Sequence, residues 1–222
     1  MTFQFFGTPV RVTWWSMIMV ALFANFGLVF FGTAGGAFAG IGIGIVSLLI
    51  HERMHVAVGD RFGISCGGIV LLPFGAVSLL ASTGQRARET FLIAVAGPLS
   101  SALLALAFFL STALFPETAP AFLRHFAAFG FLLNASWAVF NTLPMYPLDG
   151  GRMTHAVAWA VTGDERQGRV FAVKFARATI LVLGALGVVG VAAGFLDLFS
   201  FLWFGFIAWF LWQAGGSERN KP

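Results

Sequence analysis

Long apolar runs separated by short polar connectors constrain the fold of this chain more than any other feature. Six such runs cover about residues 14–31, 34–57, 91–114, 122–143, 171–193 and 195–212. Each comes close to the roughly 20 residues that an α-helix needs to cross a bilayer. Of the 222 residues, 59% are hydrophobic and 10% are charged, whereas a soluble domain carries about 25% charged residues. The sequence therefore predicts an all-α polytopic membrane protein with about six transmembrane helices, formed by a single domain over residues 1–222.

Two further stretches predict β-structure rather than spans. Residues 1–13 place a Gly-Thr-Pro turn between two short alternating segments, which is typical of two strands around a turn. Residues 63–82 are rich in glycine and β-branched side chains, with Pro-Phe-Gly in the middle, and predict a β-hairpin that dips into the membrane. Such backbone is tolerated at that depth only where protein or a water-filled cavity covers it. We expect the N-terminal strands to complete a small membrane-associated sheet with this hairpin.

The 13 lysines and arginines indicate the orientation. With six spans and the N-terminus inside, twelve of them fall on the inner side and Arg124 alone on the outer side. The positive-inside rule then places both termini, the sheet and the ends of the second and fourth spans toward the cytoplasm. The same cations are scattered along the chain with no soluble domain to present them. The net charge of +4 therefore does not indicate binding to nucleic acid. The expected surrounding of the apolar spans is a lipid bilayer.

The second span ends in the motif His-Glu-Arg-Met-His at residues 51–55. On a helix His51 and His55 point the same way, one turn apart, so both can bind one Zn²⁺. Glu52 can reach a metal-bound water and take its proton. The alternative is that two polar residues match the pattern by chance. The chain has only four histidines, and burying three ionisable groups beside so apolar a run needs a functional reason.

Glycines mark one face of the same span. Gly36, Gly40 and Gly44 recur every four residues and form a smooth face that another helix can approach closely. Continued by helical steps, this face reaches His51 and His55. We therefore expect the glycine face and the metal face to be one face.

A third metal ligand is needed, because catalytic zinc usually takes three protein groups and keeps one position for water. Asp149 directly follows the fourth span, among otherwise apolar residues. A bare carboxylate at that place is costly, and a cation at bonding distance would offset the cost. The other acids on the predicted cytoplasmic side lie in polar connectors or the tail. His155 is a further candidate, as a fourth ligand, beside its interpretation as an ordinary polar residue.

These motifs together resemble the site-2 protease family of intramembrane zinc metalloproteases. The resemblance rests on His51-Glu52-x-x-His55, Leu72-Pro73-Phe74-Gly75, Ala96-Gly97-Pro98, and Asn141-x-x-Pro144 with Leu148-Asp149-Gly150. It covers about residues 1–160, in the order and topology of the family. It implies a catalytic core at about 34–160 with peripheral helices at about 14–31, 171–193 and 195–212. Some relatives carry a PDZ or CBS domain, and we expect the compact form without either.

The resemblance also implies the roles of individual residues. His51, His55 and Asp149 would bind one Zn²⁺ per chain, and Glu52 would be the catalytic base. Asn141 would hold the substrate backbone or the oxyanion. The expected function is hydrolysis of peptide bonds within or next to the transmembrane segment of a single-span membrane-protein substrate, in regulated intramembrane proteolysis. The expected location is the cell membrane, with the active site toward the cytoplasm.

Two questions stay open from the sequence. The hairpin offers either an edge on which an extended substrate segment can pair or a plug that shields the site from lipid. The alternative function is a non-proteolytic membrane metal-binding protein or a metal transporter with the same side chains along its path. The presence of Glu52 argues against a protein that only captures membrane helices without cutting them, because that function needs no catalytic base. Transporters usually show paired broken helices from internal repeats, and this sequence has one proline-broken span and no repeat.

Overall fold

The computed structural model describes residues 1–116 and 118–219. Lys221, which the sequence-based layout counts on the inner side, lies outside the described residues. The elements in chain order are β1 (Thr2–Phe5), β2 (Thr8–Val12), α1 (Ser16–Phe31), α2 (Ala34–Arg61), β3 (Cys66–Leu72), β4 (Gly75–Leu80), α3 (Ala87–Leu114), α4 (Ala121–Thr142), α5 (Asp149–Thr162), α6 (Glu165–Ala192) and α7 (Leu198–Arg219). The prediction of a mostly helical chain with one small sheet is confirmed.

Three helices of the described residues are both long and apolar enough to cross a membrane. These are α2, α3 and α6, each with 28 residues. Their length is about 42 Å, which exceeds the hydrocarbon core of about 30 Å. Helix α1 is also apolar but has 16 residues, or about 24 Å. The chain is accordingly a multi-pass membrane protein.

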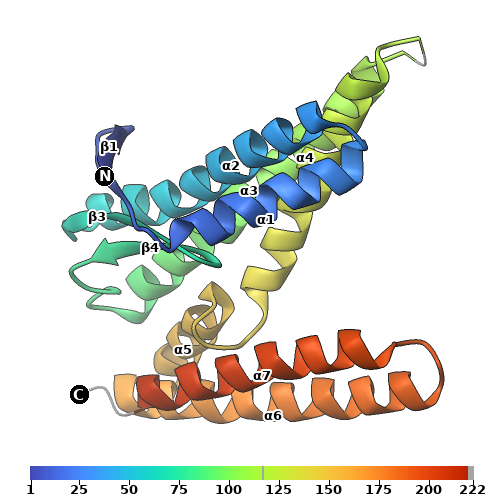
Figure 1. The fold of residues 1–222 in the computed structure, drawn as a ribbon. Coiled ribbons are helices and arrows are strands. Elements are labelled where there is room, and N and C mark those ends of the chain that lie inside the picture. Colours follow the sequence, from blue (N-terminus) through green and yellow to red (C-terminus); the bar gives the residue numbers. More distant parts are fainter. Residues whose placement is uncertain (117, 220–222) are drawn as a thin grey trace. The chain divides into compact units, whose positions relative to one another are not determined.

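The chain divides into two compact units. The first contains residues 1–85 and 95–140, and the second contains residues 86–94 and 141–222. In the first unit α1 runs alongside α2 (Figure 1). A Cβ atom added to Gly40 of α2 would lie 2.8 Å from the Cα of Gly27 in α1, so the two backbones touch at this point. The predicted close approach on the glycine face is therefore confirmed, and α1 is the helix that makes it.

The four strands form one sheet in the order β1-β2-β3-β4. Strands β1 and β2 are antiparallel and joined by Phe6 and Gly7, both with positive φ, as a tight two-residue turn requires. Strand β2 pairs parallel to β3, with Val10 opposite Ile69, and β3 pairs antiparallel to β4. The predicted hairpin and its completion by the N-terminal strands are confirmed. Val10 and Ile69 are fully buried in a core with side chains of α1 and α2, which anchors the sheet to the helices.

The second unit contains α5, α6 and α7, and α6 and α7 lie side by side in antiparallel directions (Figure 1). Helix α6 begins six residues before the span predicted at 171–193. The cause is Asp164, whose side chain accepts a hydrogen bond of 2.9 Å from the backbone N–H of Gln167 and caps the helix. The charged residues after Asp164 thus form the first turns of the helix and not a connector.

Candidate metal centre

His51, Glu52 and His55 form a buried cluster in the C-terminal half of α2. Their exposed fractions are 4%, 9% and 3%. One potential ligand atom from each lies within 4.8 Å of the others, and the two imidazole centroids are 5.0 Å apart. The helical spacing of the motif therefore brings all three groups to one place, as the sequence predicts.

Helix α3 covers this cluster at Gly97. A Cβ atom added to Gly97 would lie 2.5 Å from Nε2 of His51 and closer still to Nε2 of His55. The Nε2 atoms of both imidazoles therefore converge on residue 97 and pack against it, which is possible only because a glycine has no side chain. Zinc bonds to histidine nitrogen at about 2.0–2.1 Å and accepts two such nitrogens readily. Two imidazole nitrogens and a carboxylate with ligand atoms within 4.8 Å of one another therefore fit a zinc ion.

Ser101, one turn after Gly97 on α3, contacts the other nitrogen of His51. Its Oγ lies 2.9 Å from Nδ1, and Ser101 is fully buried. Nδ1 of His51 thus contacts this hydroxyl, while Nε2 lies beside Gly97.

A side chain of the β-sheet forms a hydrogen bond to the carboxylate of Glu52. The hydroxyl of Ser78 in β4 lies 2.6 Å from Oε2 of Glu52 and donates to it, and it also lies 3.1 Å from the backbone carbonyl of the same residue. Sequence reasoning missed both Ser78 and Ser101. The only signal for Ser101 is its position four residues after Gly97, on the same helix face, and no local pattern marks Ser78.

Asp149 lies in the second unit, at the first position of α5. A carboxylate there is favoured by the positive end of the helix dipole. The residues before α5 fold back over its first turn, so that a Cβ atom on Gly150 would lie 2.5 Å from the backbone carbonyl carbon of Thr142. Asn141 is the penultimate residue of α4 and also belongs to the second unit. His155 lies 3.2 Å from the backbone carbonyl of Glu165 through Nε2, which agrees with its interpretation as an ordinary polar residue.

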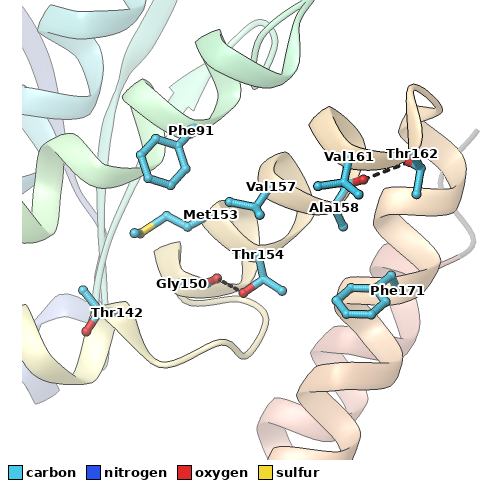
Figure 2. A pocket seen from close by; sticks show the side chains of 10 residues that line it. All are labelled: Phe91, Thr142, Gly150, Met153, Thr154, Val157, Ala158, Val161, Thr162 and Phe171. Atoms are coloured by element: carbon cyan, nitrogen blue, oxygen red, sulfur yellow. Dashed lines mark hydrogen bonds between the residues drawn. The ribbon is translucent and has the colours of Figure 1, made fainter.

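A cavity of about 490 Å³ lies within the second unit, beside α5 (Figure 2). Gly150, the residue after Asp149, forms part of its wall, and Phe91, Met153, Val157 and Phe171 supply apolar side chains. The hydroxyl of Thr154, which also lines the cavity, is bonded to the backbone carbonyl of Gly150. The lining therefore suits a hydrocarbon group and not an ion.

Comparison with known proteins identifies several relatives. The sequence profile of peptidase family M50 matches residues 39–121 and 116–184. Rip3 of Mycobacterium tuberculosis is 33% identical over 226 residues, which cover 97% of this chain and 57% of Rip3. Zinc metalloprotease MJ0392 of Methanocaldococcus jannaschii is 24% identical over 160 residues, which cover 72% of this chain and 46% of MJ0392. The chain thus spans about half the length of the curated relatives it matches.

The fold matches a solved structure, the site-2 protease from Methanocaldococcus jannaschii. The TM-score is 0.63 at 18% sequence identity, and the alignment covers all of this chain and 96% of the other. At this identity the likeness concerns the fold alone. The family profile, in contrast, extends from the glycine-rich part of α2 through α3, α4 and α5 into α6. Because this match runs from residue 39 to residue 184, well over half of the 222 residues, the chain belongs to peptidase family M50, the site-2 protease family.

Proposed function

We propose that this protein is an intramembrane zinc metalloprotease that hydrolyses peptide bonds within or next to the transmembrane segments of membrane proteins. The observation that carries the proposal is the buried cluster in α2, in which ligand atoms of His51, Glu52 and His55 lie within 4.8 Å of one another and both Nε2 atoms converge on Gly97. Membership of family M50 supports it, as does the name of the relative MJ0392, a zinc metalloprotease.

His51, His55 and Asp149 are the proposed ligands of one Zn²⁺ per chain. Zinc, when bound, supplies Lewis acidity and lowers the pKa of water toward about 7. The two imidazoles bring their Nε2 atoms together beside Gly97, and Asp149 adds a negative charge at the start of a helix. Two neutral imidazoles and one carboxylate are a ligand set that catalytic zinc sites use.

Glu52 is the proposed general base. Its carboxylate takes the proton of the attacking water and later delivers that proton to the leaving amine. Ser78 donates to Oε2 and holds the carboxylate in one orientation, which leaves Oε1 for the water. Asn141 is proposed to donate an amide N–H to the oxyanion of the tetrahedral intermediate.

Strand β4 is the proposed docking edge for the substrate. It lies at one end of the sheet order and therefore pairs with a neighbouring strand on one side only. A transmembrane helix protects its own amides, so the substrate must unwind before it is cut, and an extended segment can pair with such an edge. Ser78 belongs to this strand and contacts Glu52, so the edge lies beside the proposed base. The proposed partner is a single-span membrane protein.

The proposed topology has six spans, with both termini and the metal centre toward the cytoplasm. The distribution of lysine and arginine supports it through the positive-inside rule. In a Cys66→Ser background, a cysteine replacing Arg124 should react with an impermeant thiol reagent from outside intact cells. A cysteine replacing Arg61 should react only after the membrane is opened. The reverse labelling pattern would show that the orientation is the opposite of the proposed one.

The function is tested with purified protein in liposomes and a single-span substrate that carries a label at each end. Wild type should release fragments, and a zinc chelator should stop the release. Glu52→Gln should keep zinc and lose about 10²–10⁴-fold in rate, because it removes the base but not the ligands. Glu89→Gln is the matched control, since this glutamate lies in the first turn of α3 and pairs with Arg86. Cleavage by Glu52→Gln at the wild-type rate would remove Glu52 from the mechanism.

Zinc content is tested separately with Asp149→Ala. This variant should lose stoichiometric zinc, whereas Asp60→Ala, which removes an acid paired with Arg53 at the end of α2, should retain it. The alternative function, metal transport, predicts zinc flux into the same liposomes without fragments. Fragments without flux support the protease.

A further inference from the structure

We propose that Ser101 is a positioning residue for the metal ligand His51. The hydroxyl oxygen of Ser101 accepts a hydrogen bond from Nδ1–H of His51 and thereby sets the tautomer and the ring orientation of this histidine. This inference rests on the proposed zinc site and adds to it a residue outside the ligand set. It is carried by the contact between Nδ1 of His51 and Oγ of Ser101, at 2.9 Å.

The contact is made deep within the first unit. His51 is 4% exposed and Ser101 is fully buried, so water does not compete for the hydrogen bond. The bond also joins two helices, α2 and α3, and its partners His51 and Ser101 are 50 residues apart in the sequence. The serine therefore fixes the ring relative to a second helix and not only to its own.

The direction of this bond decides which nitrogen can bind a metal. A neutral imidazole carries one proton, and the nitrogen without it is the ligand. If Nδ1 donates to Ser101, the lone pair that can bind a metal is on Nε2, and Nε2 is the atom that lies beside Gly97 and Nε2 of His55. Metal-binding histidines commonly donate their other N–H to such a partner, and loss of the partner weakens metal binding about 10–100-fold.

The same helix offers a matched control in Ser100. Ser100 is also buried, at 7% exposure, but its hydroxyl donates to the backbone carbonyl of Gly97 within α3, at 2.7 Å. Ser100→Ala and Ser101→Ala therefore remove the same atom from neighbouring positions of one helix. Only Ser101→Ala removes a partner of His51.

Zinc affinity is the first measurement, made by competition with a chelator of known affinity on the full chain in detergent. Wild type and Ser100→Ala should bind one zinc with affinities within about twofold of each other, and Ser101→Ala should bind about 10–100-fold more weakly. If Ser101→Ala equals wild type, or if both variants weaken equally, the inference is wrong. If wild type itself binds no zinc, the proposed function fails.

The tautomer is the second measurement, and it needs no metal. With only four histidines, the ¹⁵N-histidine spectrum of the metal-free protein can be assigned by the signal lost in His51→Gln. His51 should carry its proton on Nδ1 in wild type and in Ser100→Ala, and this preference should be lost in Ser101→Ala. A proton on Nε2 of His51 in wild type would overturn the inference, because Ser101 would then be the donor.

Discussion

Gly97→Ala should destroy the metal centre while adding only one methyl group. The new Cβ would lie 2.5 Å from Nε2 of His51 and nearer still to that of His55, whereas relaxed contacts between heavy atoms are about 3.5–4.0 Å. Each ring must therefore move by about 1 Å. A zinc site tolerates changes of about 0.2 Å in its bond lengths, so the displacement is roughly five times too large. In a helix without such contacts, Gly→Ala would instead stabilise by about 1 kcal/mol.

The assay compares Gly97→Ala with Gly42→Ala. A Cβ atom on Gly42, in the same helix as the histidines, would meet no atom within 4 Å. Gly42→Ala should keep zinc with wild-type affinity, and Gly97→Ala should bind it at least about 100-fold more weakly, beyond the effect of losing an outer hydrogen-bond partner. Circular dichroism verifies that both variants keep their helices. Wild-type zinc affinity in a folded Gly97→Ala protein would show that α3 does not cover the imidazoles, and would refute the proposed geometry.

Three further predictions concern contacts within single units. Gly40→Ala should lower the free energy of unfolding in mixed micelles by about 1–3 kcal/mol, because its Cβ would overlap the backbone of α1; an unchanged free energy would contradict the close approach of the two helices. Ser78→Ala should lower kcat about 10–100-fold with zinc content unchanged, since a hydrogen bond to a charged group is worth about 1.5–3 kcal/mol; a change in KM alone would assign Ser78 to substrate binding instead. The backbone N–H of Gln167 holds the pKa of Asp164 below its usual range, so the carboxylate stabilises α6 above its unfolded-state pKa and this contribution is lost as the pH falls through the folded-state pKa. The difference in melting temperature between wild type and Asp164→Asn should therefore shrink on acidification, and a constant difference would rule out this cap as its source.

Much of the helical layout could be predicted, because the apolar composition that marks a membrane helix is visible within its own sequence segment. The run at 34–57 is apolar as far as residue 50, and the resulting helix, α2, continues four residues beyond the predicted end. The glycines of α2 likewise predict a close neighbour, since a face without side chains has no other packing role. The apolar run at 171–193 does not reveal where α6 begins, because the helix starts at Glu165 with charged residues that Asp164 caps.

The sequence alone determined that the chain enters a membrane, that α2 carries two histidines and a glutamate on one turn, and that a small sheet accompanies the helices. Each of these follows from spacing within a single element, which periodicity reports directly. Only the tertiary structure decided that Ser78 holds Glu52, that Ser101 contacts His51, and that Gly97 leaves room for both imidazoles. Such contacts depend on which faces of separate elements meet, and a serine or glycine carries the same local signal whether it faces a histidine or lipid.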